Sequence, residues 1–297
     1  MNRRALLLGG LAIAVTGCAT APSTLPAARP TTTTPPPAAT EPRFAALERQ
    51  YGTRLGLFAV ATGSGAGIAY RADERFAFCS TFKTLAAAAV LDKHPLSYLD
   101  TVVKYSKTDV DSISPITQQH IDTGMTIRDL CDAAIRYSDG TAGNLLMRDI
   151  GGPAALTAYL RTLGDHASSM DDYEPALNDE VPGSTRDTTT ARAIAGAYRQ
   201  IVLGDALTPD KRALIVDWLR RNTTGAADVR AGVPSGWTVG DKTGHSDYGR
   251  ANDIAVAWPP AGAPVVIAVL TDRVGYRTPS EYAIIADATR YVFSVLT

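Results

Sequence analysis

Strand-like and helix-like stretches are segregated along this chain, and the segregation limits the folds it can adopt. Two strand-like runs with a turn-rich connection predict a hairpin near the start of the body, at 55–62 and 67–71. Further strands are predicted in the last quarter, at 237–244, 253–258 and 264–271. Helical patterning fills the middle and returns at the end, at 81–93, 126–137, 141–149, 153–163, 189–203, 209–221 and 280–296. Because helices and strands do not alternate, the sequence predicts an α+β fold in which a helical block interrupts a sheet domain.

The N-terminal residues carry the signals of export. Two arginines precede the apolar run 5–15, which is too short to cross a bilayer and is followed by small residues. Residues 15–18, Val-Thr-Gly-Cys, resemble a bacterial lipobox, and this makes Cys18 the expected lipidation site. The paired arginines also fit a twin-arginine signal. A plain signal peptide cleaved near Ala19 or Ala21 is the alternative, and both interpretations predict an exported protein.

The next segment predicts a stalk. Residues 19–41 are mostly Pro, Thr and Ala without apolar periodicity, a composition that favours extended polyproline II over a packed structure. We therefore divide the chain into a signal peptide with lipobox (1–18), a stalk (19–41), a sheet domain (42–79 with 222–297) and an all-α domain (80–221). We expect a monomer in the cell envelope or periplasm that touches the membrane only through its lipid anchor, or a secreted protein if the anchor is absent.

Composition excludes several classes of function. Hydrophobic residues make up 45% of the chain and the formal net charge is -1, so nothing favours a nucleic-acid partner. The four histidines show no metal-ligand spacing, and we expect neither a metal nor a cofactor. A small molecule or the cell wall is the expected partner. Cys79 and Cys131 are two further cysteines of an exported chain, and the sequence leaves open whether they form a disulfide.

The first chemical signal is Ser80-Thr81-Phe82-Lys83, at the start of a predicted helix. Residues three apart share a helix face, so the amine of Lys83 can reach the hydroxyl of Ser80. The helix N-terminus favours the developing alkoxide. A serine hydroxyl needs a base within hydrogen-bond reach to become a nucleophile, and a lysine in a crowded cationic site can serve. By itself this pattern recurs by chance and has little weight.

Two further motifs give it meaning. Ser138-Asp139-Gly140 follows a helix, and Lys242-Thr243-Gly244 ends a predicted strand. Singly they are a turn and a strand end. In this order and in these structural contexts they match the penicillin-recognising serine enzymes.

A fourth segment selects within that superfamily. The stretch 171–178, Asp-Asp-Tyr-Glu-Pro-Ala-Leu-Asn, resembles the omega-loop segment of class A β-lactamases. The resemblance extends over the body from about residue 42 to the end and looks closest to the actinobacterial branch. Its clearest stretches are 75–83, 132–144 and 242–253. It implies an antiparallel five-stranded sheet flanked by terminal helices, packed against an inserted all-α domain that includes the omega loop, with the active site in the cleft between them.

The resemblance also implies roles for individual residues in hydrolysis of penicillins and cephalosporins. Ser80 is the nucleophile, and its own N–H with that of His245 forms the oxyanion hole. Lys83 and Glu174 are rival candidates for the base that activates Ser80. Ser138 passes a proton to the departing nitrogen. The expected catalytic set is therefore Ser80, Lys83, Ser138 and Glu174, and the expected substrate-binding set is Gly140, Asn178, Lys242, Thr243, Gly244 and His245.

Deacylation and carboxylate binding complete the implied mechanism. Glu174 deprotonates a water that Asn178 helps to hold, and this water attacks the acyl-enzyme. Lys242 and Thr243 hold the carboxylate of the substrate. No metal enters the reaction.

Three departures from the common family pattern affect the substrate pocket. Gly140 stands where an asparagine is usual, which predicts a more open site with relaxed selectivity. His245-Ser246 follows Lys-Thr-Gly, so we expect an additional donor from the imidazole and a wider gap between strand and omega loop. The sequence does not identify the arginine that often supports the substrate carboxylate. Arg250 should face away, and Asp228 stands near the place of this arginine in some relatives. Arg273 and Arg277 are the remaining candidates.

Two rival functions share these residues. A D-alanyl-D-alanine peptidase or transpeptidase would use Ser80, Lys83, Ser138 and Lys242 on cell-wall peptide, and Glu174 with Asn178 argues against it. A non-catalytic envelope lipoprotein could keep the fold as a binding module. Intact Ser80 and Lys83 argue against that alternative.

Overall fold

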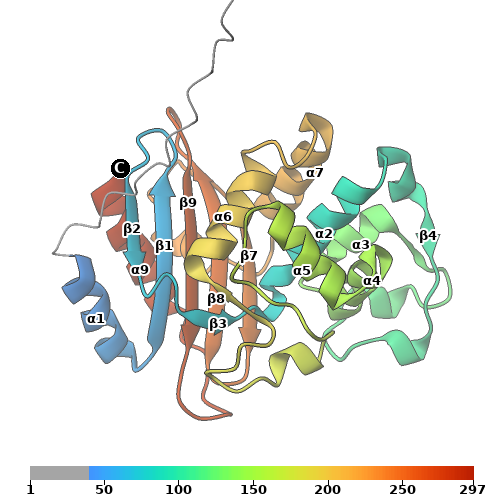
Figure 1. Cartoon of the computed structure of the whole chain (residues 1–297), viewed down its shortest axis with the longest axis horizontal. Helices are drawn as coiled ribbons and strands as arrows, with labels where there is room; N and C mark the ends of the chain where they lie inside the picture. The colour runs from blue at the N-terminus through green and yellow to red at the C-terminus, as the bar shows by residue number, and fades with distance from the viewer. Residues whose placement is uncertain (1–39) are drawn as a thin grey trace, which may run out of the picture. The chain divides into compact units, whose positions relative to one another are not determined.

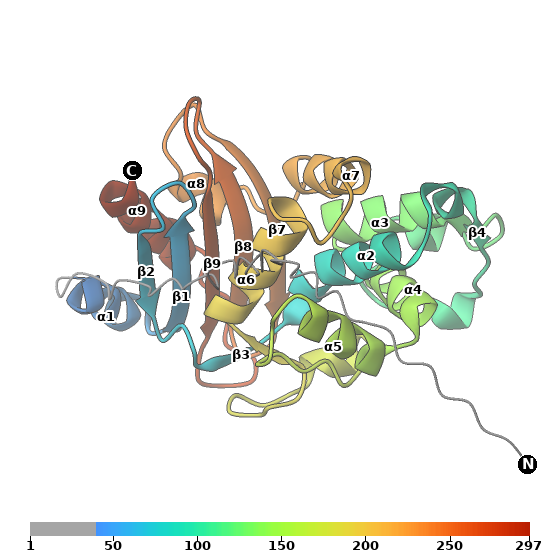
Figure 2. The same cartoon turned by 45° about the horizontal axis from the view of Figure 1, so that its top comes forward.

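The computed structural model describes residues 40–297 (Figures 1 and 2). The signal peptide, the lipobox with Cys18 and the stalk up to residue 39 lie outside this described part. In the described part, no helix combines the length and the apolar character that a membrane span requires.

A five-stranded antiparallel sheet joins the two ends of the described chain. Its order is β2-β1-β9-β8-β7. The strands are β1 (Arg54–Ala61), β2 (Gly67–Tyr70), β7 (Thr238–Ser246), β8 (Arg250–Trp258) and β9 (Val265–Asp272). The pairing of β1 with β9 joins the N-terminal hairpin to the three C-terminal strands, with Leu57 opposite Val269. The predicted α+β fold with its five-stranded antiparallel sheet is confirmed.

Both faces of the sheet are covered, which explains why β1 is buried along its length. Leu57 and Ala59 belong to the apolar core shared with the terminal helices α1 (Thr40–Tyr51) and α9 (Ala283–Leu296). Phe58 and Val60 alternate with them and belong to the core on the opposite face, shared with α6 (Ala191–Val202). The short helix α8 (Val229–Gly232) packs against α9 and β8.

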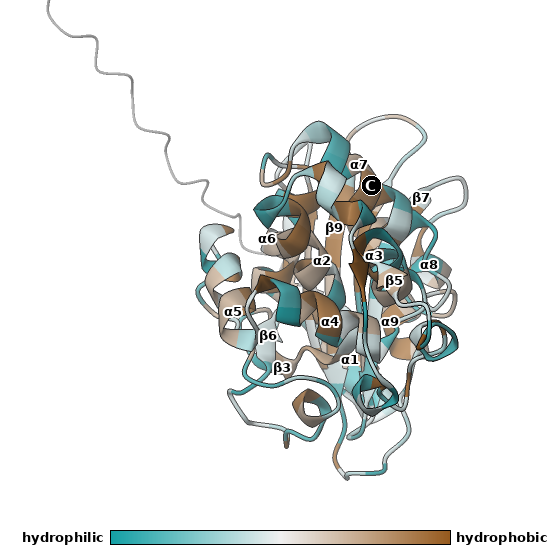
Figure 3. Cartoon of the chain, turned by 90° about the vertical axis from the view of Figure 1, so that its right-hand side faces the viewer, coloured by the Kyte–Doolittle hydropathy of each residue, from teal (hydrophilic) through white to brown (hydrophobic). Residues whose placement is uncertain are grey.

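Helix α2 (Phe82–Lys93) is the centre of the helical region. Its residues 82–91 are all buried, because neighbouring helices surround it. These helices are α3 (Ile127–Arg136), α4 (Gly140–Ile150), α5 (Pro153–Thr162), α6 and α7 (Pro209–Arg220). Figure 3 shows the apolar stretches of α4, α6 and β9 in brown, while many connecting loops are hydrophilic. This packing fixes the N-terminus of α2, where Ser80 lies.

The predicted division at residues 80 and 221 is not a clean one. Helix α6 packs against β1, β8 and β9, so it covers the sheet although it lies inside the predicted helical domain. Strand β3 (Arg75–Ala77) pairs with β6 (Thr188–Thr190). This pair joins the segment before Ser80 to the residues that precede α6. A second small pair joins β4 (Val102–Val103) to β5 (Met125–Thr126). The region 80–221 is therefore not all helical.

Most predicted helices differ from the observed ones by one to three residues at their ends. The 3-10 turns are η1 (Cys79–Thr81), η2 (Leu96–Asp100), η3 (Lys107–Asp109), η4 (Thr117–Gln119) and η5 (Ala176–Asn178). Strand β7 extends two residues beyond the predicted end at residue 244, because its pairing with β8 continues to Ser246 and Arg250.

Candidate active site

Ser80 lies in the 3-10 turn η1, immediately before α2, and faces strand β7. Cys79 before it has a φ of +46°, so the backbone turns sharply there. A Cβ placed on Gly244 of β7 would lie 3.1 Å from the Ser80 nitrogen and 3.1 Å from the Phe78 carbonyl oxygen. Gly244 therefore allows β7 to approach the backbone amide of Ser80, and the next amide along the strand is that of His245.

The Ser80 hydroxyl lies between an amine and a carboxylate. Lys83 Nζ donates to Ser80 Oγ at 2.8 Å, and Ser80 Oγ donates to Glu174 Oε1 at 3.1 Å. The same amine lies 3.0 Å from Glu174 Oε2 and donates to the Ser138 carbonyl at 2.7 Å. The side chains of Lys83 and Glu174 are only 1% and 5% exposed. Both candidate bases are thus within reach of the hydroxyl.

Glu174 is held on the omega loop, the segment 163–187 between α5 and β6. Asn144 of α4 donates to the Glu174 carbonyl at 2.8 Å, and its own Oδ1 accepts from the Glu174 N–H at 3.0 Å. Asn144 was not predicted, because no local pattern in the sequence marks a contact between residues 30 positions apart. Asn178 Oδ1 is buried and accepts no hydrogen bond within the described part of the chain. It therefore retains acceptor capacity on the omega loop.

Ser138 and Lys242 meet on the other side of the nucleophile. Ser138 has a φ of +57°, and Asp139 after it caps α4 by accepting from the Ala142 N–H. Lys242 Nζ donates to Ser138 Oγ at 3.0 Å and to the Thr243 carbonyl at 2.8 Å. Burial, with the nearby charge of Lys83, lowers the pKa of Lys242 to about 7. A substantial share of this amine is therefore neutral at physiological pH.

A chain of hydrogen bonds runs from Thr243 into the protein interior. The hydroxyls of Thr243 and Thr224 are 2.6 Å apart, and Thr224 Oγ1 donates to Asn222 Oδ1 at 2.9 Å. Asn222 Nδ2 in turn donates to Asp241 Oδ2 at 2.7 Å. Because the single proton of Thr224 goes to Asn222, the Thr243 hydroxyl is the donor in the first bond. Thr224 and Asn222 were missed, since only the fold brings the loop after α7 against β7.

The expected extra donor from His245 is only partly supported. Its side chain is 33% exposed, and its ring packs edge-on against Tyr282 at 5.0 Å between centroids. Burial and the charge of Lys242 lower the pKa of His245 to about 4, so the imidazole is neutral at physiological pH. Its Nε2 is buried without a hydrogen-bond partner and lies 3.9 Å from Asp228 Oδ2. The ring thus faces a carboxyl group.

Two of the three arginines considered for the substrate carboxylate donate to backbone carbonyls elsewhere, and the third is exposed. Arg250 donates to the Asn178 carbonyl at 3.1 Å and to the Glu180 carbonyl, so it ties β8 to the omega loop. Arg273 donates to the carbonyls of Gly52 and Pro279. Arg277 is exposed.

Ser246 joins the link between β8 and the omega loop. Its Oγ lies 3.4 Å from Arg250 Nη1 and 3.2 Å from Cys79 Sγ. The hydroxyl thus contacts the guanidinium that binds the loop, which gives no support to the expectation that Ser246 widens the gap between strand and loop.

Gly140 provides space for two carboxylates. A Cβ at this position would lie 2.6 Å from Glu174 Oε2 and 2.9 Å from Asp111 Oδ1. Asp111, which the sequence analysis missed, also accepts from the Ile113 N–H. The space beside Gly140 is therefore occupied by acidic oxygens, which gives no support to the expectation of a more open site.

The sequence left open whether Cys79 and Cys131 form a disulfide. Cys79 and Cys131 are both buried and free, so they do not form a disulfide. Burial raises the pKa of both thiols.

Within residues 40–297, three acidic residues of the omega loop form one cluster that could hold a metal ion. The carboxylate oxygens of Asp172, Glu180 and Asp187 lie within 4.8 Å of one another. Arg186 bonds to Asp172 and Glu180.

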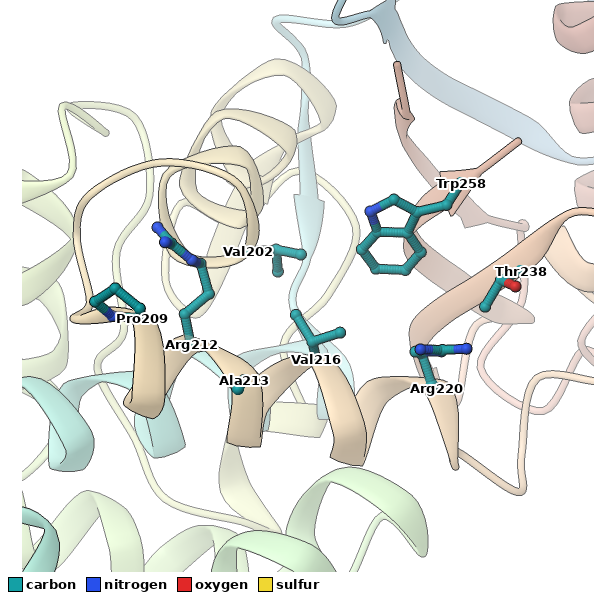
Figure 4. A pocket seen from close by; sticks show the side chains of 8 residues that line it. All are labelled: Val202, Pro209, Arg212, Ala213, Val216, Arg220, Thr238 and Trp258. Carbon is teal, nitrogen blue, oxygen red and sulfur yellow. The ribbon is translucent and has the colours of Figure 1, made fainter. Parts of the chain in front are cut away.

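A separate pocket of about 360 Å³ lies outside the candidate active site (Figure 4). Figure 4 shows Arg212, Ala213 and Val216 on α7, with Trp258 and Thr238 on the strands opposite. None of the predicted site residues lines it.

Comparison with known proteins identifies the family of this chain. Residues 39–296 match the Beta-lactamase enzyme family. The chain is 56% identical to the β-lactamase of Mycobacterium tuberculosis strain H37Rv, over 99% of this chain and 98% of that protein. It is 58% identical to the β-lactamase of Amycolatopsis lactamdurans, over 87% of this chain and 85% of that protein.

Solved structures give the same result. The β-lactamase from Streptomyces albus G superposes with a TM-score of 0.85 at 45% identity, covering 88% of this chain and 100% of that one. The β-lactamase from Streptosporangium roseum gives a TM-score of 0.85 at 42% identity, covering 88% and 99%.

Proposed function

The chain belongs to the class A β-lactamase family and hydrolyses β-lactams, which confers resistance to these antibiotics; from this premise we propose that Ser80 forms the acyl-enzyme and Glu174 drives its hydrolysis. One observation carries the proposal: the Ser80 hydroxyl lies 2.8 Å from the Lys83 amine and 3.1 Å from the Glu174 carboxylate. A serine with a base on each side can be activated for attack and released again afterwards.

Acylation begins when Ser80 Oγ attacks the lactam carbonyl carbon and gives its proton to Lys83 or Glu174. We assign the oxyanion hole to the amides of Ser80 and His245. Gly244 supports this assignment, because it permits the strand to approach Ser80 closely. The C–N bond then breaks, and the leaving nitrogen takes a proton from the Ser138 hydroxyl. The proton that Ser80 released replaces it, which leaves Ser138 intact and the base free for deacylation. Lys242, 3.0 Å from that hydroxyl, assists the transfer.

Deacylation returns the enzyme to its starting state. A water placed between Glu174 and Asn178 loses a proton to Glu174 and attacks the ester carbonyl. The bond to Ser80 Oγ breaks, and the oxygen recovers its proton. Asn144 supports this step by holding the backbone of Glu174 through two hydrogen bonds, and the unpartnered Asn178 Oδ1 supports the placement of the water.

Penicillins and cephalosporins carry a carboxylate beside the lactam ring, and we assign its binding to Lys242 and Thr243. The amine supplies charge, and the Thr243 hydroxyl supplies a directed hydrogen bond. For this bond the Thr243 proton must turn away from Thr224.

The competing function is a D-alanyl-D-alanine peptidase that β-lactams inactivate. Purified protein is incubated with benzylpenicillin, and the intact protein mass is followed together with product release. We expect rapid turnover by the wild type, no adduct in Ser80→Ala, and an adduct of one substrate mass that persists in Glu174→Ala. A stable adduct in the wild type would assign the protein to the peptidases instead. A wild type that neither turns over nor binds benzylpenicillin covalently would indicate a non-catalytic binding module.

We also propose that the protein is exported and lipidated at Cys18 and acts as a monomer in the cell envelope. The lipobox-like residues 15–18 and the Pro/Thr-rich segment after them support the export proposal. Wild type labelled with a fatty acid should carry the label and partition into detergent. Cys18→Ala should lose both properties. Equal labelling of the two forms would contradict lipidation at this residue, and a dimer mass in light scattering would contradict the monomer.

A further inference from the structure

Three carboxyl groups are buried together behind the strand that carries Lys242. Asp228, Asp241 and Asp253 have exposed fractions of 1%, 0% and 0%. Asp228 immediately precedes α8, Asp241 is the neighbour of Lys242 on β7, and Asp253 of β8 is paired with Thr243 across the sheet. Burial of an ionised carboxylate is costly unless it is paired, so the partners of each group decide its charge.

Asp241 is fully partnered. Its Oδ1 accepts from Arg230 Nε at 2.6 Å, and its Oδ2 accepts from Asn222 Nδ2 at 2.7 Å. Arg230 is the cation that faces the group from α8, and it is committed to Asp241 and to the carbonyls of Leu219 and Arg220. Burial raises the pKa of Asp241 as well, but Arg230, Asn222 and Lys242 counteract this rise. Because Asp241 is the one carboxyl group of the three with a bonded cation, it is the member of the cluster that most readily stays ionised.

Asp228 and Asp253 have no such compensation. Asp253 Oδ2 accepts from the Val229 N–H at 3.0 Å, while its Oδ1 has no hydrogen-bond partner. Asp228 Oδ1 is also buried without a partner. Burial, together with the charge of Asp241, raises the pKa of Asp228 to about 7, and the same causes with Asp228 itself raise that of Asp253. Protons are therefore retained in this cluster near neutral pH.

Asp228 also lies beside a residue of the proposed substrate site. Its Oδ2 lies 3.9 Å from His245 Nε2, and the partly exposed His245 follows the Lys-Thr-Gly segment on β7. The imidazole is neutral at physiological pH, so it does not cancel a negative charge on Asp228. In a buried, poorly screened setting, such a charge acts over the short distance to the neighbouring strand residues.

We propose that Asp228 is a specificity-determining residue: when ionised it weakens the binding of β-lactams that carry a carboxylate, and when protonated it permits their binding. The inference rests on the proposed function, in which Lys242 and Thr243 hold that carboxylate. A bound substrate anion favours the protonated form of Asp228, so binding takes up a proton over the range in which Asp228 titrates. A β-lactam without the negative charge does not experience this coupling.

Lys242 titrates in the same range and must be separated from Asp228. Loss of its positive charge above pH 7 also weakens the binding of an anion. The two effects have the same sign, but only one of them depends on residue 228. Comparison of the wild type with Asp228→Asn at each pH isolates the contribution of Asp228, because the variant retains the titration of Lys242.

The experiment measures KM for benzylpenicillin and for its uncharged methyl ester between pH 5.5 and 8.5. We expect the wild-type KM for benzylpenicillin at pH 8.5 to be roughly tenfold above that of Asp228→Asn, and the two to agree within about twofold at pH 5.5. The KM for the ester should not depend on residue 228 at any pH. Asp100→Asn, which removes a charge from a side chain that is 78% exposed, serves as the control.

Each outcome has a distinct meaning. If the acid and the ester have equal KM values in the wild type even at pH 5.5, the proposed binding of the carboxylate by Lys242 and Thr243 fails. If the wild type prefers the acid but Asp228→Asn has the wild-type KM at pH 8.5, the inference about Asp228 is overturned and the pH dependence belongs to Lys242. Should Asp228→Asn not fold, Asp228→Ala removes the same charge and is judged by the same two ratios.

Discussion

Lys83 Nζ and Glu174 Oε2 lie 3.0 Å apart, and both side chains are almost completely buried. The two residues come from helix α2 and from the omega loop, so this ion pair links the element that carries the nucleophile to the element that carries the proposed deacylation base. Each partner also contacts the Ser80 hydroxyl, and a change in either one alters the environment of both.

The first prediction concerns the stability of this pair. Lys83→Met should lower the free energy of unfolding by about 3 kcal/mol, because it leaves a buried carboxylate without its cation. The double variant Lys83→Met/Glu174→Gln should lose less than the sum of the two single variants, with a coupling of about 1–3 kcal/mol. Urea unfolding of the four proteins measures this coupling. Additive effects would mean that the pair contributes no mutual stabilisation.

Gly140→Ala tests the space in front of Glu174. The new Cβ would approach Glu174 Oε2 to 2.6 Å and displace the carboxylate. A displacement of this kind should lower kcat about tenfold or more and lead to accumulation of the acyl-enzyme, as read by rapid-quench mass spectrometry. The matched control is Gly196→Ala on α6, where the added Cβ has no atom within 4 Å.

Gly140→Asn introduces the asparagine that is usual at this position in the family. Asparagine brings the same Cβ, so an altered substrate profile in that variant would combine the new amide with the displaced Glu174. The effect attributable to the amide is the difference between Gly140→Asn and Gly140→Ala. If both variants keep the wild-type kcat and substrate profile, the lack of a side chain at residue 140 affects neither deacylation nor selectivity.

Arg250→Ala should release the omega loop from β8. The guanidinium holds the carbonyls of Asn178 and Glu180, and Asn178 is the proposed partner of the deacylating water. We expect a larger decrease in the deacylation rate than in the acylation rate, seen as a pre-steady-state burst followed by slow turnover. Arg273→Ala, which removes hydrogen bonds to the carbonyls of Gly52 and Pro279, is the control. A decrease of similar size in both variants would point to general destabilisation.

Asp187 on the omega loop predicts a pH-dependent stability. Its Oδ1 accepts from the N–H groups of Asp171 and Asp172, while Oδ2 is buried without a partner. Burial raises the pKa of Asp187 from 3.8 to about 6. Since the unfolded chain releases this proton at lower pH than the folded protein, stability falls as the pH rises from about 4 to 6 and stays reduced above that.

Asp187→Asn should remove this penalty, because an asparagine keeps the acceptor and carries no charge. We expect a gain of up to about 3 kcal/mol in the free energy of unfolding at pH 7 that disappears below pH 4. Thermal unfolding at pH 4, 5, 6 and 7 measures the difference between the two proteins. A variant that is equally or less stable than the wild type at pH 7 would show that the ionised carboxylate is compensated in the fold.

Much of this protein was predictable because its strongest signals are local. Ser80 and Lys83 meet because they stand one helical turn apart, and the segregation of helices and strands predicted the α+β architecture. Ser138 precedes a helix whose cap, Asp139, is the next residue, so its place at a helix start also follows from adjacent residues. Motif spacing of this kind depends on the backbone periods and needs no knowledge of distant contacts.

Other features depended on which segments the fold brings together. Asn144 supports Glu174 across 30 residues, Arg250 reaches back 72 residues to Asn178, and Asp228 meets His245 because the loop before α8 packs behind β7. No local pattern marks these contacts.

The sequence by itself determined the family, the proximity of Ser80 to Lys83 and the order of the elements, because these follow from short-range spacing and from hydrophobic periodicity. Only the tertiary structure decided that Cys79 and Cys131 remain free, that Arg250 holds the omega loop, and that Asp228, Asp241 and Asp253 share one buried space. The physical reason is that charge state, pairing and hydrogen bonding depend on distance and burial, and for residues far apart in the chain these are set by the packing of the whole domain.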